Sequence, residues 1–167
     1  MEGMDANMAA VAAGQAASSI NLMETVMGIT YIGGQGCTLA LVLMCMRSKV
    51  KKLKSIGRVC IFPAIFNINE TMTFGLPIVL NPILAIPFMF APVISATFAY
   101  WMTVIGFAQV ISFQVPWTTP VGIMGFLATG GHIGTAITQI ICVALSVVIY
   151  TPFVLISNKQ AQMEENQ

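Results

Sequence analysis

The sequence predicts an all-α membrane protein whose transmembrane helices are interrupted by re-entrant hairpins or broken helices. Of the 167 residues, 57% are hydrophobic and 8% are charged, and the mean hydropathy is +0.86. A soluble domain has about a quarter of its residues charged, so this composition is wrong for a water-facing surface. Glu70 is the only charged residue between Arg58 and Lys159. Prolines and glycines within the apolar stretches predict breaks in the helices.

The N-terminal part of the chain predicts a polar segment followed by a first membrane element. Residues 1–25 are polar or small, and we expect an exposed loop or a loose helix there. Residues 26–46 are uncharged and long enough to cross a bilayer, which requires about 20 apolar residues. The sequence GGQG within this stretch predicts a break or a hairpin. We expect a membrane domain over residues 26–157 and a polar tail at residues 158–167.

Six of the seven basic residues lie between Arg47 and Arg58, in RSKVKKLKSIGR. A basic cluster beside apolar segments is typical of a cytoplasmic loop, which we expect at residues 47–58. Contact with anionic lipid is compatible with this role. Nucleic-acid binding and an amphipathic surface helix are weaker interpretations, because apolar segments flank the cluster on both sides. If the basic cluster and Lys159 lie on the same side of the membrane, the chain between them must cross the membrane an even number of times.

The central part of the chain predicts broken elements between two spanning helices. Residues 59–92 contain five prolines and three asparagines, so residues 61–80 are expected to form a re-entrant hairpin or a broken helix. Irregular backbone at membrane depth is stable only where protein or a water-filled cavity satisfies it. Residues 88–112 and 133–156 predict spanning helices, and residues 116–132 predict a second re-entrant element. Broken elements in a membrane chain point to a transport site.

Glu70 is the strongest single indication of function. A carboxylate in a membrane segment is energetically costly, so it usually faces a cavity and has a functional role. The alternative is a structural glutamate that is bonded to backbone amides of the broken helix. The neighbouring Asn67 and Asn69 either hydrogen-bond a polyol or cap a helix end. Together, a buried acid and amides suit a sugar, whose hydroxyl groups need both acceptors and donors.

The motif PWTTP supplies further candidates. Trp117 either packs on the apolar face of a sugar ring or anchors the chain at the membrane interface. Thr118 and Thr119 can donate hydrogen bonds to a ligand or to freed backbone carbonyls. His132, the only histidine, is interpreted as a solvated or hydrogen-bonded loop residue.

The cysteines and glycines do not indicate a cofactor. The four cysteines are scattered through apolar stretches without CxxC spacing, and we interpret them as small buried hydrophobic residues. We therefore expect no metal site, no disulfide framework and no cofactor. GGQG lacks the lysine and hydroxyl pattern of a phosphate-binding loop, which argues against nucleotide binding.

Three separated motifs resemble one known family. PAIFNINETMTFGLPIVLNPILAIPFMFAP resembles the signature of the membrane permease (IIC) component of bacterial sugar phosphotransferase systems, in the lactose, cellobiose and diacetylchitobiose family. GGQGCTLAL resembles the glycine-rich stretch that precedes this signature. PWTTP followed by GFLATGG resembles a second motif downstream of it. The order and the spacing agree over residues 30–157.

The resemblance implies import of a β-linked disaccharide such as cellobiose or diacetylchitobiose, by alternating access coupled to phosphorylation. The phosphoryl group would come from a phosphocysteine of a separate IIB protein, since none of the four cysteines lies in a IIB-like loop. Glu70, preceded by Asn69, would contact the sugar and help to activate its hydroxyl group as a catalytic residue. Trp117 would pack on the sugar. The predicted substrate-binding set comprises Asn67, Asn69, Glu70, Trp117 and Thr118.

The resemblance also has departures and open alternatives. Thr71 replaces the proline that usually follows the glutamate, and Gln35 and Cys37 replace small residues. The match covers only the C-terminal part of a family permease, so we expect a fragment or a split half that needs a missing permease half or a homodimer. The alternative is a truncated derivative that acts as a non-transporting membrane assembly partner or receptor. Either way, the expected location is the bacterial inner (plasma) membrane, multi-pass, with the basic loop and the C-terminus cytoplasmic.

Overall fold

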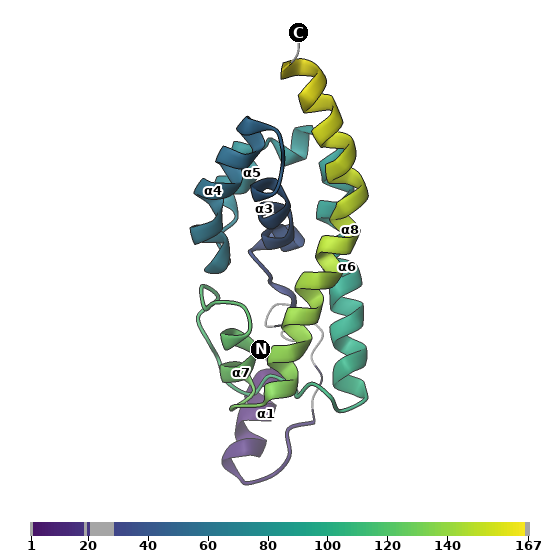
Figure 1. Cartoon of the computed structure of the whole chain (residues 1–167). Helices are drawn as coiled ribbons and strands as arrows, with labels where there is room; N and C mark the ends of the chain where they lie inside the picture. The colour runs from purple at the N-terminus through teal and green to yellow at the C-terminus, as the bar shows by residue number, and fades with distance from the viewer. Residues whose placement is uncertain (1, 19, 21–28, 166–167) are drawn as a thin grey trace.

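A computed structural model describes residues 2–18, 20 and 29–165, and this part of the chain is all-helical, as predicted. Figure 1 shows an elongated molecule in which two long helices run beside a group of shorter ones. The helices are α1 (Glu2–Ala12), the 3-10 helix η1 (Gln35–Cys37), α3 (Thr38–Met46), α4 (Lys51–Ile65), α5 (Glu70–Gly75), the 3-10 helix η2 (Ile78–Leu80), α6 (Pro82–Val104), α7 (Ile123–Ala128) and α8 (Ile133–Glu165).

The long helices α6 and α8 are long and apolar enough to cross a membrane, over Pro82–Val104 and Ile133–Gln160. They lie against each other along their length (Figure 1). α6 presents small buried residues at four-residue spacing, Ala91, Ser95 and Ala99, which lets two helix backbones approach closely in a membrane. Between the helices, the Ser95 and Ser146 hydroxyl oxygens lie 3.3 Å apart in a hydrogen bond.

The boundaries of these two helices differ from the predicted ones. α6 begins at Pro82 rather than at residue 88, because proline suits the first turn of a helix and Asn81 caps it by accepting from the Ile83 N–H at 3.0 Å. It ends at Val104 rather than at residue 112, and residues 105–122 follow without regular helix. α8 begins where it was predicted, but it continues to Glu165 and so includes most of the expected polar tail.

The predicted breaks around GGQG and within residues 61–80 are confirmed. Gly33, Gly34 and Gly36 all have positive φ, so the described part of the expected span 26–46 is a bend followed by the nine-residue helix α3. Residues 26–28 of that span lie outside the described residues. Between residues 61 and 80, α4 ends, the chain turns, and the short helix α5 packs against α4.

The basic segment is more helical than predicted. Only residues 47–50 form a turn, and α4 begins at Lys51 inside the basic cluster. The Ser48 hydroxyl supports this turn by accepting from the Val50 N–H at 3.2 Å. Lysine, leucine and arginine are good helix formers, so the intrinsic preference of the segment favours the helix. The first helix of the chain, α1, is tied to the rest through Asn7, whose side-chain amide donates to the Ile111 carbonyl at 3.1 Å.

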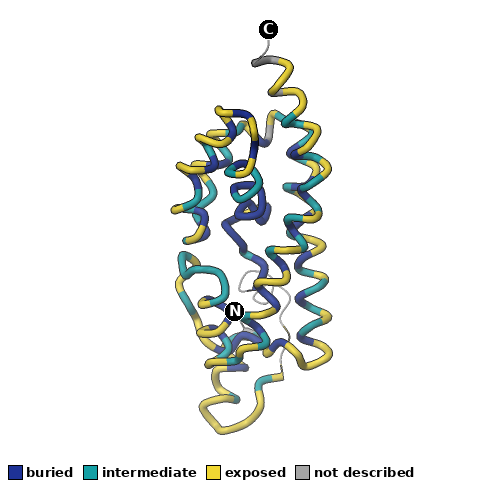
Figure 2. Tube along the Cα trace, in the orientation of Figure 1, coloured by how far each residue is buried: buried dark blue, intermediate teal, exposed yellow. Residues whose placement is uncertain are grey.

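The burial pattern suits a protein surrounded by apolar material. Figure 2 shows exposed residues along the outer sides of the long helices, with buried residues where they face the shorter ones. Many of the exposed side chains are large and apolar, among them Phe90, Trp101, Ile140 and Val148. The four cysteines are all buried and free, as expected of small hydrophobic residues.

Tyr150 joins α8 to the glycine-rich bend. Its side chain is fully buried, and its hydroxyl donates to the Gly36 carbonyl at 2.7 Å. Tyr150→Phe should lower the free energy of unfolding by about 1–3 kcal/mol, because the buried carbonyl loses its partner. Thermal unfolding of the purified chain in detergent measures this effect. Tyr100→Phe is the matched control, since no hydrogen bond from the Tyr100 hydroxyl is seen among the described residues; equal unfolding temperatures for both variants would contradict the assignment.

Candidate functional site

One buried amide, that of Asn67, joins three segments that are far apart in the sequence. Asn67 lies in the turn between α4 and α5 with a φ of 61°, a left-handed conformation that asparagine tolerates better than most residues. Its Oδ1 accepts from the Gly33 N–H at 2.9 Å. Its Nδ2 donates to the carbonyls of Trp117 at 2.9 Å and Thr119 at 2.8 Å. The glycine-rich bend, the α4–α5 turn and the PWTTP loop therefore meet at this side chain.

Asn69 also links the α4–α5 turn to the glycine-rich bend. Its Nδ2 donates to the Gln35 carbonyl at 2.9 Å, and its own carbonyl accepts from the Thr73 hydroxyl at 2.9 Å. Gly34 makes this close approach possible, because a Cβ atom there would lie 2.7 Å from the Asn69 Cβ and 2.8 Å from the Asn67 carbonyl oxygen. Asn69 occupies the N-cap position of α5, but its side chain makes no capping hydrogen bond.

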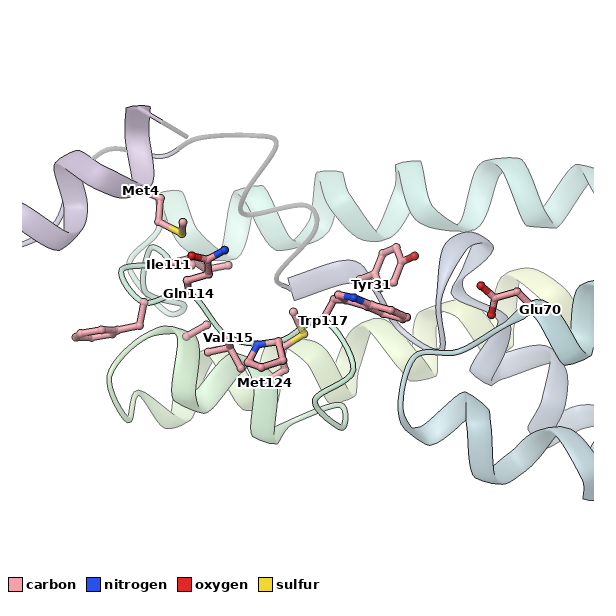
Figure 3. A pocket seen from close by; sticks show the side chains of 11 residues that line it. Met4, Tyr31, Glu70, Ile111, Gln114, Val115, Trp117 and Met124 are labelled. Atoms are coloured by element: carbon pink, nitrogen blue, oxygen red, sulfur yellow. The ribbon is translucent and has the colours of Figure 1, made fainter.

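A cavity of about 840 Å³ opens beside this junction. It lies within the range of about 300–1,000 Å³ that is typical of small-molecule sites. Figure 3 shows the Glu70 carboxylate at one end of the cavity and Met4 towards the other. The lining residues come from the N-terminal helix, the glycine-rich bend, the start of α5, the 111–117 segment and α7: Met4, Tyr31, Glu70, Ile111, Phe113, Gln114, Val115, Pro116, Trp117, Met124 and Ala128.

The lining combines one anionic acceptor with aromatic and apolar surfaces. Glu70 is the first residue of α5 and its side chain is exposed to the cavity. Trp117 is 52% exposed, so a large part of its indole is available to a ligand. Tyr31 and Gln114 add a hydroxyl and an amide to the lining. Such a set can hold a sugar, because the aromatic faces match its C–H groups and the polar groups match its hydroxyls.

The structure separates the predicted site residues into two groups. Glu70 and Trp117 line the cavity together, although 47 positions separate them in the sequence. Asn67, Asn69 and Thr118 do not line it. Asn67 is 1% exposed, and both hydrogens of its amide nitrogen already have carbonyl acceptors. Thr118 lies in the tight turn closed by the bond from the Thr119 N–H to the Pro116 carbonyl at 2.9 Å.

Two polar lining residues, Tyr31 and Gln114, were missed by reasoning from the sequence. Tyr31 lies two positions before the first glycine of GGQG, and its position beside a chain break is a signal that could have indicated it. Gln114 is an isolated amide in an otherwise apolar segment, and this contrast is a second such signal. His132 lies at the start of α8 and does not line the cavity; its buried Nδ1 has no hydrogen-bond partner among the described residues.

Comparison with known proteins gives one consistent family. Residues 3–92 match the family described as Phosphotransferase system, EIIC. The chain is 42% identical over 165 residues to the lichenan permease IIC component of Bacillus subtilis (strain 168), across 98% of this chain and 36% of that protein. It is 50% identical over 137 residues to the cellobiose-specific EIIC component of Geobacillus stearothermophilus, across 81% of this chain and 30% of that protein.

A solved structure agrees with these relatives. The crystal structure of the transporter ChbC, the IIC component from the N,N'-diacetylchitobiose-specific phosphotransferase system, matches with a TM-score of 0.91 and 42% sequence identity. The match covers 99% of this chain and 39% of the ChbC chain, and the chain spans about a third of the length of the curated relatives described above. The fold and the three motifs thus lead to the same conclusion: the chain belongs to the EIIC permease family of the phosphotransferase system.

Proposed function

We propose that this chain forms the sugar-binding part of a phosphotransferase-system permease for a β-linked disaccharide such as cellobiose or diacetylchitobiose. The observation that carries the proposal is that Glu70 and Trp117 line one cavity of about 840 Å³. One relative is a cellobiose-specific EIIC component, and the similar solved structure is the IIC component from an N,N'-diacetylchitobiose-specific phosphotransferase system. A disaccharide is elongated, which suits a cavity with the acid at one end and apolar residues along its length.

Glu70 is proposed to bind a sugar hydroxyl and to accept its proton. The hydroxyl oxygen would form a bond to the phosphorus of a phosphocysteine on the IIB protein, while the sulfur–phosphorus bond breaks. The hydroxyl proton would pass to the Glu70 carboxylate, which acts as a general base. Asn67 and Asn69 would assist this step by fixing the turn that precedes Glu70, through the hydrogen bonds described above.

Trp117 is proposed to hold the apolar face of a sugar ring. Trp117→Ala should weaken binding of cellobiose or diacetylchitobiose by about 10- to 100-fold, because the contact between the indole and the sugar ring is lost. Isothermal calorimetry with the purified chain in detergent measures the affinity. Trp101→Ala is the matched control, since Trp101 is 59% exposed on α6 and does not line the cavity.

Two results would count against this site. Unchanged affinity in Trp117→Ala would show that the indole does not contact the sugar. Absence of binding by a folded, monodisperse wild-type chain would show that the cavity needs a further permease segment. Since this chain covers 36% and 30% of the two relatives, we propose that complete transport requires a further permease segment or a second copy of this part of the permease.

The proposed orientation in the bacterial plasma membrane places the basic turn and the C-terminal end of α8 on the cytoplasmic side. The two segments lie at the same end of the molecule, where the Ser48 hydroxyl donates to the Asn158 side-chain oxygen at 3.0 Å. All seven basic residues lie in this turn, in the first half of α4 that follows it, or in the C-terminal end of α8. This end would face the cytoplasm by the positive-inside rule, and it is the side on which the phosphorylated IIB protein would approach.

A further inference from the structure

The outer face of α4 carries cationic side chains followed by apolar ones. The exposed residues of this helix recur at three- and four-residue spacing, so they share one face. We call this face the α4 stripe; its residues are Lys51, Lys52, Lys54, Ser55, Arg58, Val59, Phe62 and Ile65. Val59 is 67% exposed and Phe62 is 71% exposed. The opposite face of α4 is buried, through Leu53, Cys60 and Ala64.

The cationic half of the stripe has no acidic residue close to it in the sequence. No acidic residue lies between Glu24 and Glu70 in the sequence, and the first turn of α4 contains none. The N-terminus of a helix carries a partial positive charge. Lys51 and Lys52 therefore increase the positive charge at the start of α4 and do not neutralise it. No side chain caps this end of α4. An anionic group would therefore be stabilised here by the lysines, and the helix end would contribute in the same direction.

The apolar half of the stripe follows the cationic half directly, towards the C-terminal end of α4. Arg58 and Phe62 are four residues apart, which is about 6 Å along a helix. The ring of Phe62 lies 5.3 Å from that of Phe66, centroid to centroid, and the two form a broad apolar ridge. The whole stripe from Lys51 to Ile65 extends about 21 Å. A bilayer leaflet has a hydrocarbon depth of about 15 Å, so the apolar half can lie among acyl chains while the cationic half meets headgroups.

We propose that the α4 stripe binds an anionic phospholipid, with the phosphate against Lys51, Lys52 and Arg58 and the acyl chains along Val59, Phe62 and Ile65. The basic side chains are complementary to an anionic group. The adjoining apolar side chains are complementary to a hydrocarbon part of the same ligand. A soluble acidic protein would match the cations alone and would leave the aromatic ridge without a partner. The proposal does not depend on sugar binding. It does concern the same helix that ends at the Asn67 turn.

Lipid selectivity of the purified chain tests the proposal. The delipidated chain in detergent is titrated with phosphatidylglycerol and, separately, with phosphatidylcholine, and bound lipid is counted by native mass spectrometry. We expect phosphatidylglycerol to bind at least about tenfold more tightly, since each basic residue near a headgroup contributes on the order of 1 kcal/mol. Inorganic phosphate at equal concentration should not displace it. Equal binding of the two lipids, or displacement by phosphate alone, would overturn the proposal.

Two triple variants with the same change in charge localise the site. Lys51→Gln, Lys52→Gln and Arg58→Gln together should remove the preference for phosphatidylglycerol. The control triple, at Arg47, Lys49 and Lys159, removes three exposed cations outside the stripe and should keep the preference within about threefold. Equal losses in the two triples would mean non-specific charge attraction and would refute a defined site.

A further variant separates the apolar contact from the headgroup contact. Phe62→Gln leaves every charge in place and should weaken phosphatidylglycerol binding by at least about threefold, because an exposed apolar contact is lost. All of the substituted side chains are exposed, so folding should be retained, and thermal unfolding checks this. Unchanged lipid affinity in Phe62→Gln would contradict the proposed path of the acyl chains.

Discussion

Asn67→Asp is expected to lower sugar affinity by about 100-fold and to destabilise the chain by about 3 kcal/mol. The substitution replaces the Nδ2 donor by an oxygen that faces the carbonyls of Trp117 and Thr119, which now lie within 2.9 Å and 2.8 Å of the amide nitrogen. Aspartate tolerates the left-handed backbone at this position as well as asparagine does. The change therefore removes the donor and leaves the backbone preference intact, so the PWTTP loop should separate from the α4–α5 turn.

Calorimetric sugar binding and thermal unfolding of the purified variant measure the two effects. Asn69→Asp is the matched control, because it makes the same chemical change two residues away. The single bond of Asn69 to the Gln35 carbonyl is exposed, so its loss should cost much less than the loss at the buried Asn67. Equal effects at the two positions would contradict the view that Asn67 holds the cavity wall in place.

Glu70→Gln is expected to lower the rate of sugar phosphorylation by about 10²- to 10⁴-fold, the usual contribution of a general base. Glutamine has the same shape as glutamate and can still hydrogen-bond a hydroxyl, but it cannot take up the proton. The measurement is formation of phosphorylated cellobiose by the complete permease in membrane vesicles supplied with phosphorylated IIB protein. The amount of protein inserted in the membrane is measured in parallel.

The pattern of losses separates the two roles of Glu70. Retained sugar binding with lost phosphorylation would identify the carboxylate as the proton acceptor. Loss of both would assign it to sugar binding alone. A normal phosphorylation rate in the variant would remove Glu70 from the mechanism altogether.

Composition and chain breakers were enough to predict the main features of the fold. The scarcity of charge predicted the apolar helices, and the prolines and glycines predicted the breaks that bring the start of α5 to the cavity. Helix boundaries were less predictable. α6 starts at Pro82 because Asn81 caps it. α4 extends into the basic segment, because the residues there have a high helix propensity and form a helix in place of the predicted loop.

The site was predictable only in part, because its construction depends on contacts between distant segments. Glu70 stood out as a lone charge, and Trp117 stood out beside PWTTP. The three bonds of Asn67 join residues 34 to 52 positions away, and no local pattern indicates such partners. Asn67 was predicted as a sugar ligand, and in the structure its amide hydrogen-bonds to the backbone of Gly33, Trp117 and Thr119. Tyr31 reaches the cavity for a similar reason, through the bend at GGQG.

The most direct test of a sugar site at this cavity uses Trp117 as its own reporter. The chain has two tryptophans, so Trp101→Phe leaves only the indole that lines the cavity. Titration with cellobiose or diacetylchitobiose should produce a saturable change in its fluorescence, and the Trp117→Phe variant, which keeps Trp101, should show none. A folded Trp101→Phe protein that binds either sugar by calorimetry without any change in Trp117 emission would place the sugar elsewhere and contradict the account.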